Sequence, residues 1–365
     1  MKLSATREVL LNPLQAVIGV VERRQTMPIL ANVLLVAKKN RLSVTATDLE
    51  VELVAAVDVD IDQEGEVTVP GRKLLDICKA LDSGVKVSVA LKGDRVHLQA
   101  GRSRFTLASL AAAEFPTVDD IQSTASVTVD EAKMVWLLEK TQFAMAQQDV
   151  RYYLNGLLIE TAEKGVRAVA TDGHRLALAD IDVVGSEAAG KQVIVPRKGV
   201  IELQRLLKGE GELTLELGDN HIRVQVGDIR FTSKLIDGRF PDYERVIPDN
   251  ARNVMMANRE GLRQAMSRAA ILSNEKYRGI RLEVKDSGVT IEAHNPDQEE
   301  AEEELEVEYS GDDIEIGFNV NYLLDALAAI ESGEVKLSLI DANSSCLLND
   351  TTRDDVQYVV MPMRL

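Results

Sequence analysis

The chain has 365 residues, of which 45% are hydrophobic, 28% are charged and only 4% are aromatic. This length and composition exclude a disordered chain and predict two or three globular domains whose cores consist mainly of aliphatic side chains. The formal net charge of −17 opposes nucleic-acid binding unless positive charge is segregated on one face of the protein.

The compartment can be inferred from the N-terminus and the cysteines. Arg7 and Glu8 interrupt the apolar residues of the N-terminus, so no signal peptide is predicted. No run reaches the ~18 apolar residues of a membrane span. Cys78 and Cys346 have neither metal-ligand nor disulfide-framework spacing, and we assign them no role. A reduced, cytoplasmic protein without a metal site is therefore expected.

Three stretches along the chain each begin with a predicted helix behind a capping residue, at Thr6, Asp130 and Asn258. Alternating segments such as 42–47 and 335–339 follow these helices and predict antiparallel strands. Each stretch is therefore expected to combine helices with a larger number of strands.

A second helix is predicted later in each stretch, and here the three copies resemble one another. A short β-rich run precedes a turn or cap position and then an amphipathic helix. Pro70 and Pro196 suit the start of a helix, and Asn319 could cap one instead. The three segments are Val67–Leu81, Val193–Leu207 and Ile316–Ile330.

Other pairs recur at the same interval of about 125 residues, which is far longer than a solenoid repeat. Thr47–Asp48 recurs as Thr171–Asp172, and Phe115–Pro116 recurs as Phe240–Pro241. We therefore predict a triplicated α+β fold, with two helices and antiparallel sheets in each domain. The predicted domains are residues 1–123, 124–250 and 251–365.

Three similar domains can meet through equivalent edges and leave two edges unpaired at the ends of the chain. Two such chains, joined head to tail about a two-fold axis, would close a six-domain ring. Basic residues near the end of the first domain would then face the glutamate-rich segment 299–308 of the third. The predicted interface residues are Arg95, Arg102, Arg104, Phe105, Leu107, Ile271, Leu272, Glu299, Glu300 and Glu303.

Over its whole length the chain resembles the β subunit of bacterial DNA polymerase III, the sliding clamp family. The most specific segments are 148–156, 170–176, 195–200, 231–235, 237–243, 268–276 and 358–365. The resemblance implies a homodimeric ring with helices lining the hole, which needs no cofactor and hydrolyses nothing. The implied partners are double-stranded and primed DNA, an ATP-dependent clamp loader, replicative and translesion DNA polymerases, and mismatch-repair and other replication proteins.

Two sets of site residues follow from the resemblance. The first set would contact DNA and comprises Arg24, Arg72, Lys73, Gln148, Tyr152, Tyr153, Arg197, Lys198 and Arg205. The second set would form a largely apolar pocket for linear peptides, between the central and C-terminal domains. Its members are Leu154, Thr171, Gly173, His174, Arg175, Leu176, Pro241, Val246, Val359, Met361, Pro362 and Met363.

Two other classes of function are compatible with the sequence. Asp172 and His174 could form a general-base pair, but adjacent residues of a strand point in different directions and no nucleophile elbow accompanies them. A multidomain adaptor that binds peptides and never touches DNA would show the same triplication. Surface lysines and arginines would then serve solubility alone.

Overall fold

A computed structural model of the chain describes residues 1–21, 27–118, 121–162, 165–183, 190–249 and 251–364. The chain folds into two compact units. The first comprises Met1–Ala132, Gly185–Lys191 and Lys198–Leu235, and the second comprises Lys133–Val184, Gln192–Arg197 and Ile236–Leu365. The central repeat of the sequence is therefore divided between the two units, with one of its sheets in each.

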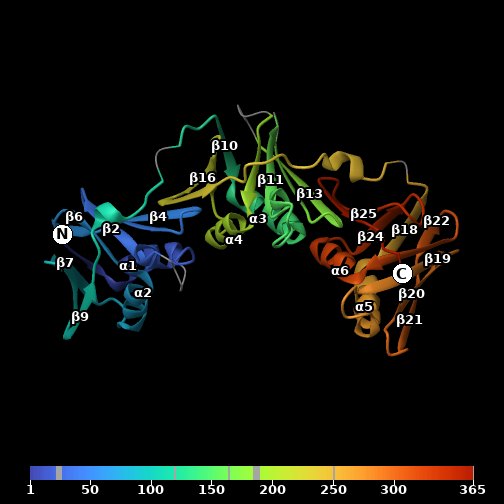
Figure 1. Ribbon diagram of the computed structural model, residues 1–365, viewed down its shortest axis with the longest axis horizontal. Helices are drawn as coiled ribbons and strands as arrows, with labels where there is room; N and C mark the ends of the chain where they lie inside the picture. The colour runs from blue at the N-terminus through green and yellow to red at the C-terminus, as the bar shows by residue number, and fades with distance from the viewer. Residues whose placement is uncertain (22–26, 119–120, 163–164, 184–189, 250, 365) are drawn as a thin grey trace. The chain divides into compact units, whose positions relative to one another are not determined.

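The helices form where the sequence predicts them (Figure 1). Each begins directly after its predicted capping or turn residue, and the side chains of Asn258 and Asn319 accept hydrogen bonds from the backbone N–H of Gly261 and Asn321. No helix among the described residues is long and apolar enough to span a membrane. The helices are α1 (Arg7–Val17), α2 (Gly71–Ala80), α3 (Glu131–Thr141), α4 (Arg197–Leu206), α5 (Arg259–Ala269) and α6 (Val320–Ala329).

The first unit contains two antiparallel sheets, with α1 and α2 packed beside each other. The five-stranded sheet has the order β5 (Asp60–Gln63), β1 (Lys2–Thr6), β7 (Lys86–Lys92), β8 (Arg95–Ala100) and β9 (Ser103–Ala108). The eight-stranded sheet has the order β10 (Ala125–Asp130), β15 (Glu212–Leu217), β16 (His221–Val226), β17 (Ile229–Lys234), β4 (Val51–Asp58), β3 (Arg41–Thr47), β2 (Asn32–Lys38) and β6 (Gly65–Pro70).

The second unit follows the same plan, with α5 beside α6. Its nine-stranded sheet has the order β14 (Gln192–Pro196), β11 (Gly156–Ala162), β12 (Gly165–Thr171), β13 (Arg175–Asp182), β26 (Val356–Val360), β25 (Cys346–Asp350), β24 (Glu334–Leu339), β18 (Asn253–Asn258) and β22 (Glu308–Ser310). Its four-stranded sheet has the order β21 (Glu300–Glu306), β20 (Gly288–His294), β19 (Gly279–Lys285) and β23 (Ile314–Asn319).

Neighbouring repeats share one continuous sheet inside each unit. In the first unit β17 pairs antiparallel with β4, and Phe231 lies opposite Leu53. In the second unit β26 pairs antiparallel with β13, and Tyr358 lies opposite Ala177. Phe231 and Tyr358, which the sequence repeat aligns, are both fully buried. Main-chain hydrogen bonds and aromatic packing therefore join the repeats at both junctions in the same way.

Both cysteines belong to the aliphatic cores. Cys78 on α2 and Cys346 on β25 are fully buried as free thiols. Burial raises the pKa of the Cys78 thiol to about 11 and that of Cys346 to about 12. Neither residue forms the thiolate that nucleophilic or redox chemistry requires.

A buried carboxylate holds the end of α6 against the turn between β25 and β26. Asp350 is 5% exposed and accepts hydrogen bonds from the backbone N–H groups of Glu331 (3.0 Å), Ser332 (3.1 Å) and Thr352 (2.8 Å), and from the Thr352 hydroxyl (2.6 Å). Burial alone would raise the pKa of Asp350, but these four bonds outweigh it and hold the pKa well below its ordinary value.

Replacing Asp350 by alanine leaves these donors, of which the Ser332 N–H is buried, without their acceptor. We expect Asp350→Ala to lower the free energy of unfolding at pH 7 by about 2–3 kcal/mol, measured by urea titration with circular dichroism. Because the folded-state pKa is depressed, the stabilisation is present above the unfolded pKa of about 4 and is lost as the pH falls. The difference in free energy of unfolding between the wild type and the Asp350→Ala variant should therefore become smaller at acidic pH. Asp354→Ala, at an exposed carboxylate of the same turn, is the control and should change little.

Candidate functional site

A pocket of about 170 Å³ in the second unit is the candidate site. It lies where four segments meet: the 3-10 helix η4 (Tyr152–Leu154), the turn between β12 and β13, the 3-10 helix η5 (Tyr243–Val246) and the end of β26. Its lining residues are Arg151, Tyr153, Leu154, Thr171, Gly173, Arg175, Leu176, Pro241, Asp242, Tyr243, Val246, Val359 and Met361.

The turn between β12 and β13 is fixed by hydrogen bonds of its own side chains. Thr171 Oγ1 donates to the Arg175 carbonyl (2.6 Å) and accepts from the Gly173 N–H (3.0 Å). Asp172 accepts from the backbone N–H groups of His174 (2.9 Å) and Arg175 (3.0 Å). Gly173 has a φ of +87°, and a Cβ there would lie 2.6 Å from the Arg151 guanidinium. The turn thus favours glycine at this point.

Arg175 anchors this turn to its surroundings. Its guanidinium donates to the Asp172 carboxylate (3.1 Å) and to the Phe143 carbonyl (2.7 Å), and it forms an ion pair with Asp325. The same group lies 4.8 Å from the centre of the Tyr322 ring. Because the guanidinium is held on several sides, the pocket wall is rigid before any ligand arrives.

The floor of the pocket is apolar. Leu176 and Val359 are buried in a cluster that also contains Phe240 and Tyr243. The Tyr243 hydroxyl donates to Glu160 (3.0 Å), which holds the ring in place as a wall. Burial raises the pKa of Tyr243, so the hydroxyl stays protonated at neutral pH. An apolar floor with a few fixed polar groups at its rim suits the side chains of a short peptide.

Most of the residues predicted for the peptide pocket do line it. The exceptions are His174, Pro362 and Met363. The imidazole of His174 is exposed and stacks on Tyr322 with ring centres 6.3 Å apart, and the Met363 N–H donates to the Gly317 carbonyl (2.9 Å). Arg151, Asp242 and Tyr243 also line the pocket and were not predicted, although they lie in the segments 148–156 and 237–243 that carry the resemblance.

The Asp172 and His174 side chains do not form an acid–base pair. The Asp172 carboxylate is used by backbone N–H groups of the turn and by the Arg175 side chain, while the His174 ring lies against Tyr322. Within the described ranges, no cluster of three or more His, Cys, Asp or Glu side chains could hold a metal ion.

The residues predicted to contact DNA have different surroundings. Arg72 and Lys73 are exposed on α2, and Arg72 donates to the Val21 carbonyl (2.5 Å). Lys198 forms an ion pair with the buried carboxylate of Asp48. Arg197 is half-buried at the start of α4, and Arg24 lies outside the described residues.

Arg205 bridges two helices. It donates to the Ala16 carbonyl at the end of α1 (2.8 Å) and lies 2.9 Å from the Glu202 carboxylate. Within the first unit it thus ties α4 to α1, a role that the sequence did not predict.

The three predicted DNA contacts in η4 and the loop before it are divided between solvent and pocket. Gln148 is exposed with a φ of +57°, and Tyr152 is 57% exposed. Tyr153 is half-buried and lines the pocket. Only the first two present side chains that solvent freely reaches.

The predicted interface residues lie on two sheet edges and a nearby apolar turn. β9 and β21 are the edge strands of their sheets. Arg95, Arg102, Arg104 and Glu300 are exposed, Phe105 is half-buried, and Leu107 is buried in its own core. Ile271 is 74% exposed and Leu272 is half-buried in the 3-10 helix η6 (Ala270–Leu272).

Two of the predicted interface glutamates already have intramolecular partners. Glu303 binds Arg268 of α5 through two bonds of 2.7 and 2.5 Å, and Glu299 accepts from the Asn295 side chain (2.7 Å). The run of negative charge in segment 299–308 is therefore partly neutralised within the chain.

Three family profiles match the chain in sequence order. They are the DNA polymerase III beta subunit N-terminal domain at residues 1–119, the central domain at 128–242 and the C-terminal domain at 244–364. The beta sliding clamps of Pseudomonas putida and Escherichia coli K12 are 53% and 52% identical over 367 residues, which cover all of both chains in each case. The chain therefore belongs to the DNA polymerase III beta subunit family, the beta sliding clamps.

Solved structures agree with this assignment. The crystal structure of the Pseudomonas aeruginosa beta subunit has a TM-score of 0.98 at 52% identity, and the solved structure of Caulobacter crescentus pol III beta has a TM-score of 0.96 at 40% identity, both over the full chains. A Pseudomonas aeruginosa clamp bound to griselimycin has a TM-score of 0.96 at 52% identity over both whole chains.

These comparisons confirm the predicted family and the three-domain clamp fold. A beta sliding clamp is a non-catalytic processivity factor of DNA replication. The prediction that the chain is not an enzyme is thus confirmed by its family.

Proposed function

We propose that two copies of the chain join head to tail and close a six-domain ring around duplex DNA. The repeated junction is the observation that supports this most: β17 pairs with β4, and β26 with β13. By its place in the sheet order, β9 is the counterpart of β17 and β26, and β21 that of β4 and β13. Both are edges in a single chain, so the same pairing can form between two copies.

The internal junctions also supply a register for the junction between subunits. Phe231 lies opposite Leu53, and the repeat aligns Phe105 with Phe231. Carried over to the third junction, this register brings Phe105 opposite Ala301 of the partner subunit and Arg104 opposite Glu302 of the partner subunit. Opposite charges on facing positions stabilise a strand pair.

In the ring that we propose, the exposed basic residues of α2 and the basic start of α4 face the DNA. Contacts with phosphates carry no sequence information, so such a ring can slide along the duplex. Retention is topological and needs no tight affinity, while the acidic remainder of the surface repels stray nucleic acid. A clamp loader using ATP would open the ring on primed DNA.

The pocket of the second unit is, in our proposal, the docking site for partner peptides. Its apolar floor, fixed rim and flexible Met361 suit short linear segments from different proteins. DNA polymerases, the loader and mismatch-repair proteins are the expected partners, in the cytoplasm. Griselimycin bound to a clamp 52% identical to this chain supports a ligand site of this kind.

The proposed domain limits are 1–123, 124–250 and 251–365. The three family matches, one to each repeat, support the number of domains.

The interface can be tested by truncating its apolar turn. We expect Ile271→Ala with Leu272→Ala to convert the dimer into monomers, because apolar side chains at the centre of an interface dominate its affinity. Sedimentation should then give a mass near the 40.1 kDa of one chain. Ile340→Ala, at another exposed apolar residue, should stay dimeric. A double variant that keeps twice the chain mass would contradict this interface.

The peptide pocket can be tested with griselimycin as the probe. We expect Met361→Glu to weaken binding at least ~tenfold, about 1.4 kcal/mol, because a carboxylate would have to be desolvated at an apolar site. Isothermal titration calorimetry measures the change. Lys234→Glu, at the equivalent position of the first unit, is the matched control and should bind as wild type does. Equal affinity of the Met361 variant and wild type would refute this pocket.

A further inference from the structure

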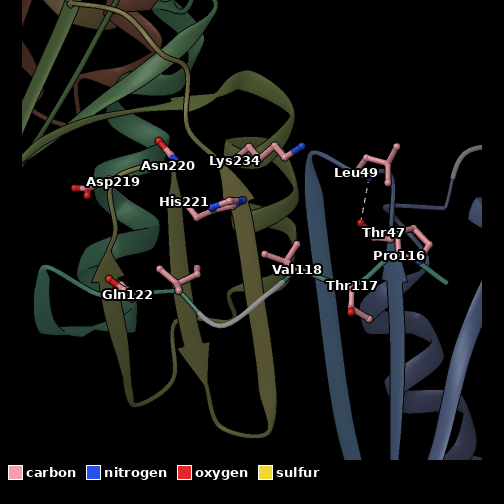
Figure 2. A pocket seen from close by; sticks show the side chains of 11 residues that line it. Thr47, Leu49, Pro116, Thr117, Val118, Gln122, Asp219, Asn220, His221 and Lys234 are labelled. Atoms are coloured by element: carbon pink, nitrogen blue, oxygen red, sulfur yellow. Dashed lines mark hydrogen bonds between the residues drawn. The ribbon is translucent and has the colours of Figure 1, made fainter. Parts of the chain in front are cut away.

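The first unit holds a second pocket, of about 470 Å³, where its own two repeats meet (Figure 2). The turn after β3, the connector that follows residue 115 and the ends of β16 and β17 border it. The lining residues that matter here are Thr47, Leu49, Pro116, Val118, His221 and Lys234.

The turn beside this pocket repeats the hydrogen bonds of the turn in the peptide pocket. Thr47 Oγ1 donates to the Val51 carbonyl (2.9 Å) and accepts from the Leu49 N–H (3.1 Å), which are the two bonds that Thr171 makes in the second unit. Asp48 accepts from the Val51 N–H (2.7 Å). The same hydrogen-bonded turn therefore exists at both junctions.

The closing strand and the connector also correspond. The Lys234 N–H donates to the Glu50 carbonyl (2.8 Å), as the Met361 N–H does to the His174 carbonyl (2.8 Å). The connector proline Pro116 lines this pocket, as its counterpart lines the other. The two pockets are thus equivalent sites of the triplicated fold.

The side chains at these equivalent positions differ in chemistry. Glu52 replaces Leu176, and Thr232 replaces Val359, so the apolar floor is absent here. The Glu52 carboxylate is 1% exposed and accepts a hydrogen bond from the Val118 N–H (2.9 Å). The Glu52 side chain thus fills the deep part of the site and holds the connector in place. A ligand would therefore lie outside this deep part of the pocket, over β16 and β17.

Two basic side chains face the space that remains. His221 and Lys234 lie opposite each other on β16 and β17, and Figure 2 shows the Lys234 side chain extending toward Leu49. No residue in the described part of the chain hydrogen-bonds or ion-pairs with either side chain, whereas the nearby Asp219 carboxylate lies 2.9 Å from Lys191 Nζ. Burial and the nearby positive charges of Lys234 and Arg223 lower the pKa of His221, so its imidazole is neutral at neutral pH and can donate a hydrogen bond. The Lys234 ammonium supplies the positive charge that favours an anion in this space.

Leu49 supplies an apolar wall beside these groups. Its φ of +78° lies in the left-handed region, where the equivalent position of the second unit has Gly173. Leu49 is 40% exposed, so its side chain is available to a ligand. An anionic group and an apolar group can thus be bound next to each other.

We propose that this pocket is a second peptide site, selective for a segment in which an acidic side chain adjoins an apolar one. The choice of a peptide as occupant rests on the proposed function of the equivalent pocket in the second unit. The selectivity for acid rests on the positive charge of Lys234, because the equivalent residue there is the uncharged Met361.

The test uses two rhodamine-labelled probes, leucyl-glutamyl-leucine amide and its glutaminyl counterpart, with fluorescence polarisation on the full chain. Met361→Glu serves as the background because its added carboxylate repels the acidic probe from the other pocket. In that background we expect the glutamyl probe to bind at least roughly fivefold more tightly than the glutaminyl probe, since the charge-assisted contact is lost with the amide. Adding Lys234→Met should abolish the preference.

Leu49→Gly is the second variant, and it suits the backbone because glycine favours a φ of +78°. This substitution should weaken the binding of both probes to the same extent. Circular dichroism should show that the variant remains folded. A preference that survives Lys234→Met, or no binding of either probe to the folded protein, would overturn the second site. Griselimycin titration of the wild type reports the peptide pocket separately. If the wild type does not bind griselimycin but the preference for the glutamyl probe still depends on Lys234, the proposed peptide pocket is refuted and the second site is supported.

Discussion

The pairing of one repeat's last strand with the neighbouring repeat's sheet is the interaction on which the rest of the structure depends. β17 continues the sheet of β4, and β26 continues the sheet of β13, so main-chain hydrogen bonds run without a break across each junction. Such a junction is stiff, because separating the repeats would expose a row of backbone donors and acceptors. It also creates both pockets, since each lies where a connector crosses the seam of a shared sheet.

The residue at one equivalent position of the three repeats sets the chemistry at that edge of the repeat's own sheet. Leu176, Glu52 and Glu300 occupy equivalent places on β13, β4 and β21. Leucine gives an apolar floor that can receive side chains. Glu52 is desolvated, so its pKa is raised above the ordinary value, and it holds the connector through the Val118 N–H. Glu300 lies exposed on an edge strand and remains available to a partner surface. The three repeats thus keep the same strand register at this position while the side chain differs in each.

The sequence alone predicts much of this architecture, because its signals are local. The capping residues Asn258 and Asn319 fix where two helices start, and the repeated Thr-Asp pairs mark the turns beside both pockets. Contact between repeats through equivalent edges was expected, but the strands that pair in this sharing could not be predicted, because strand partners distant in the chain leave no periodic signal. The division of the central repeat between two units follows from that sharing.

The partners of individual side chains could not be predicted from the sequence either. Arg205 and Glu303, which are predicted to contact DNA and the partner subunit, bind the Ala16 carbonyl and Arg268 within the chain. These are tertiary contacts between elements far apart in sequence. Tyr153, which the resemblance implies as a DNA contact, packs against the core cluster and lines the pocket.

Topological linkage is the central claim, and retention on DNA tests it most directly. The protein would be loaded on nicked circular DNA by a clamp loader with ATP, and its retention measured before and after a single cut that linearises the circle. A ring that encircles DNA should be retained on the circle and lost after the cut, because it slides off the ends. Equal retention on circular and linear DNA would mean ordinary affinity binding and would contradict the ring.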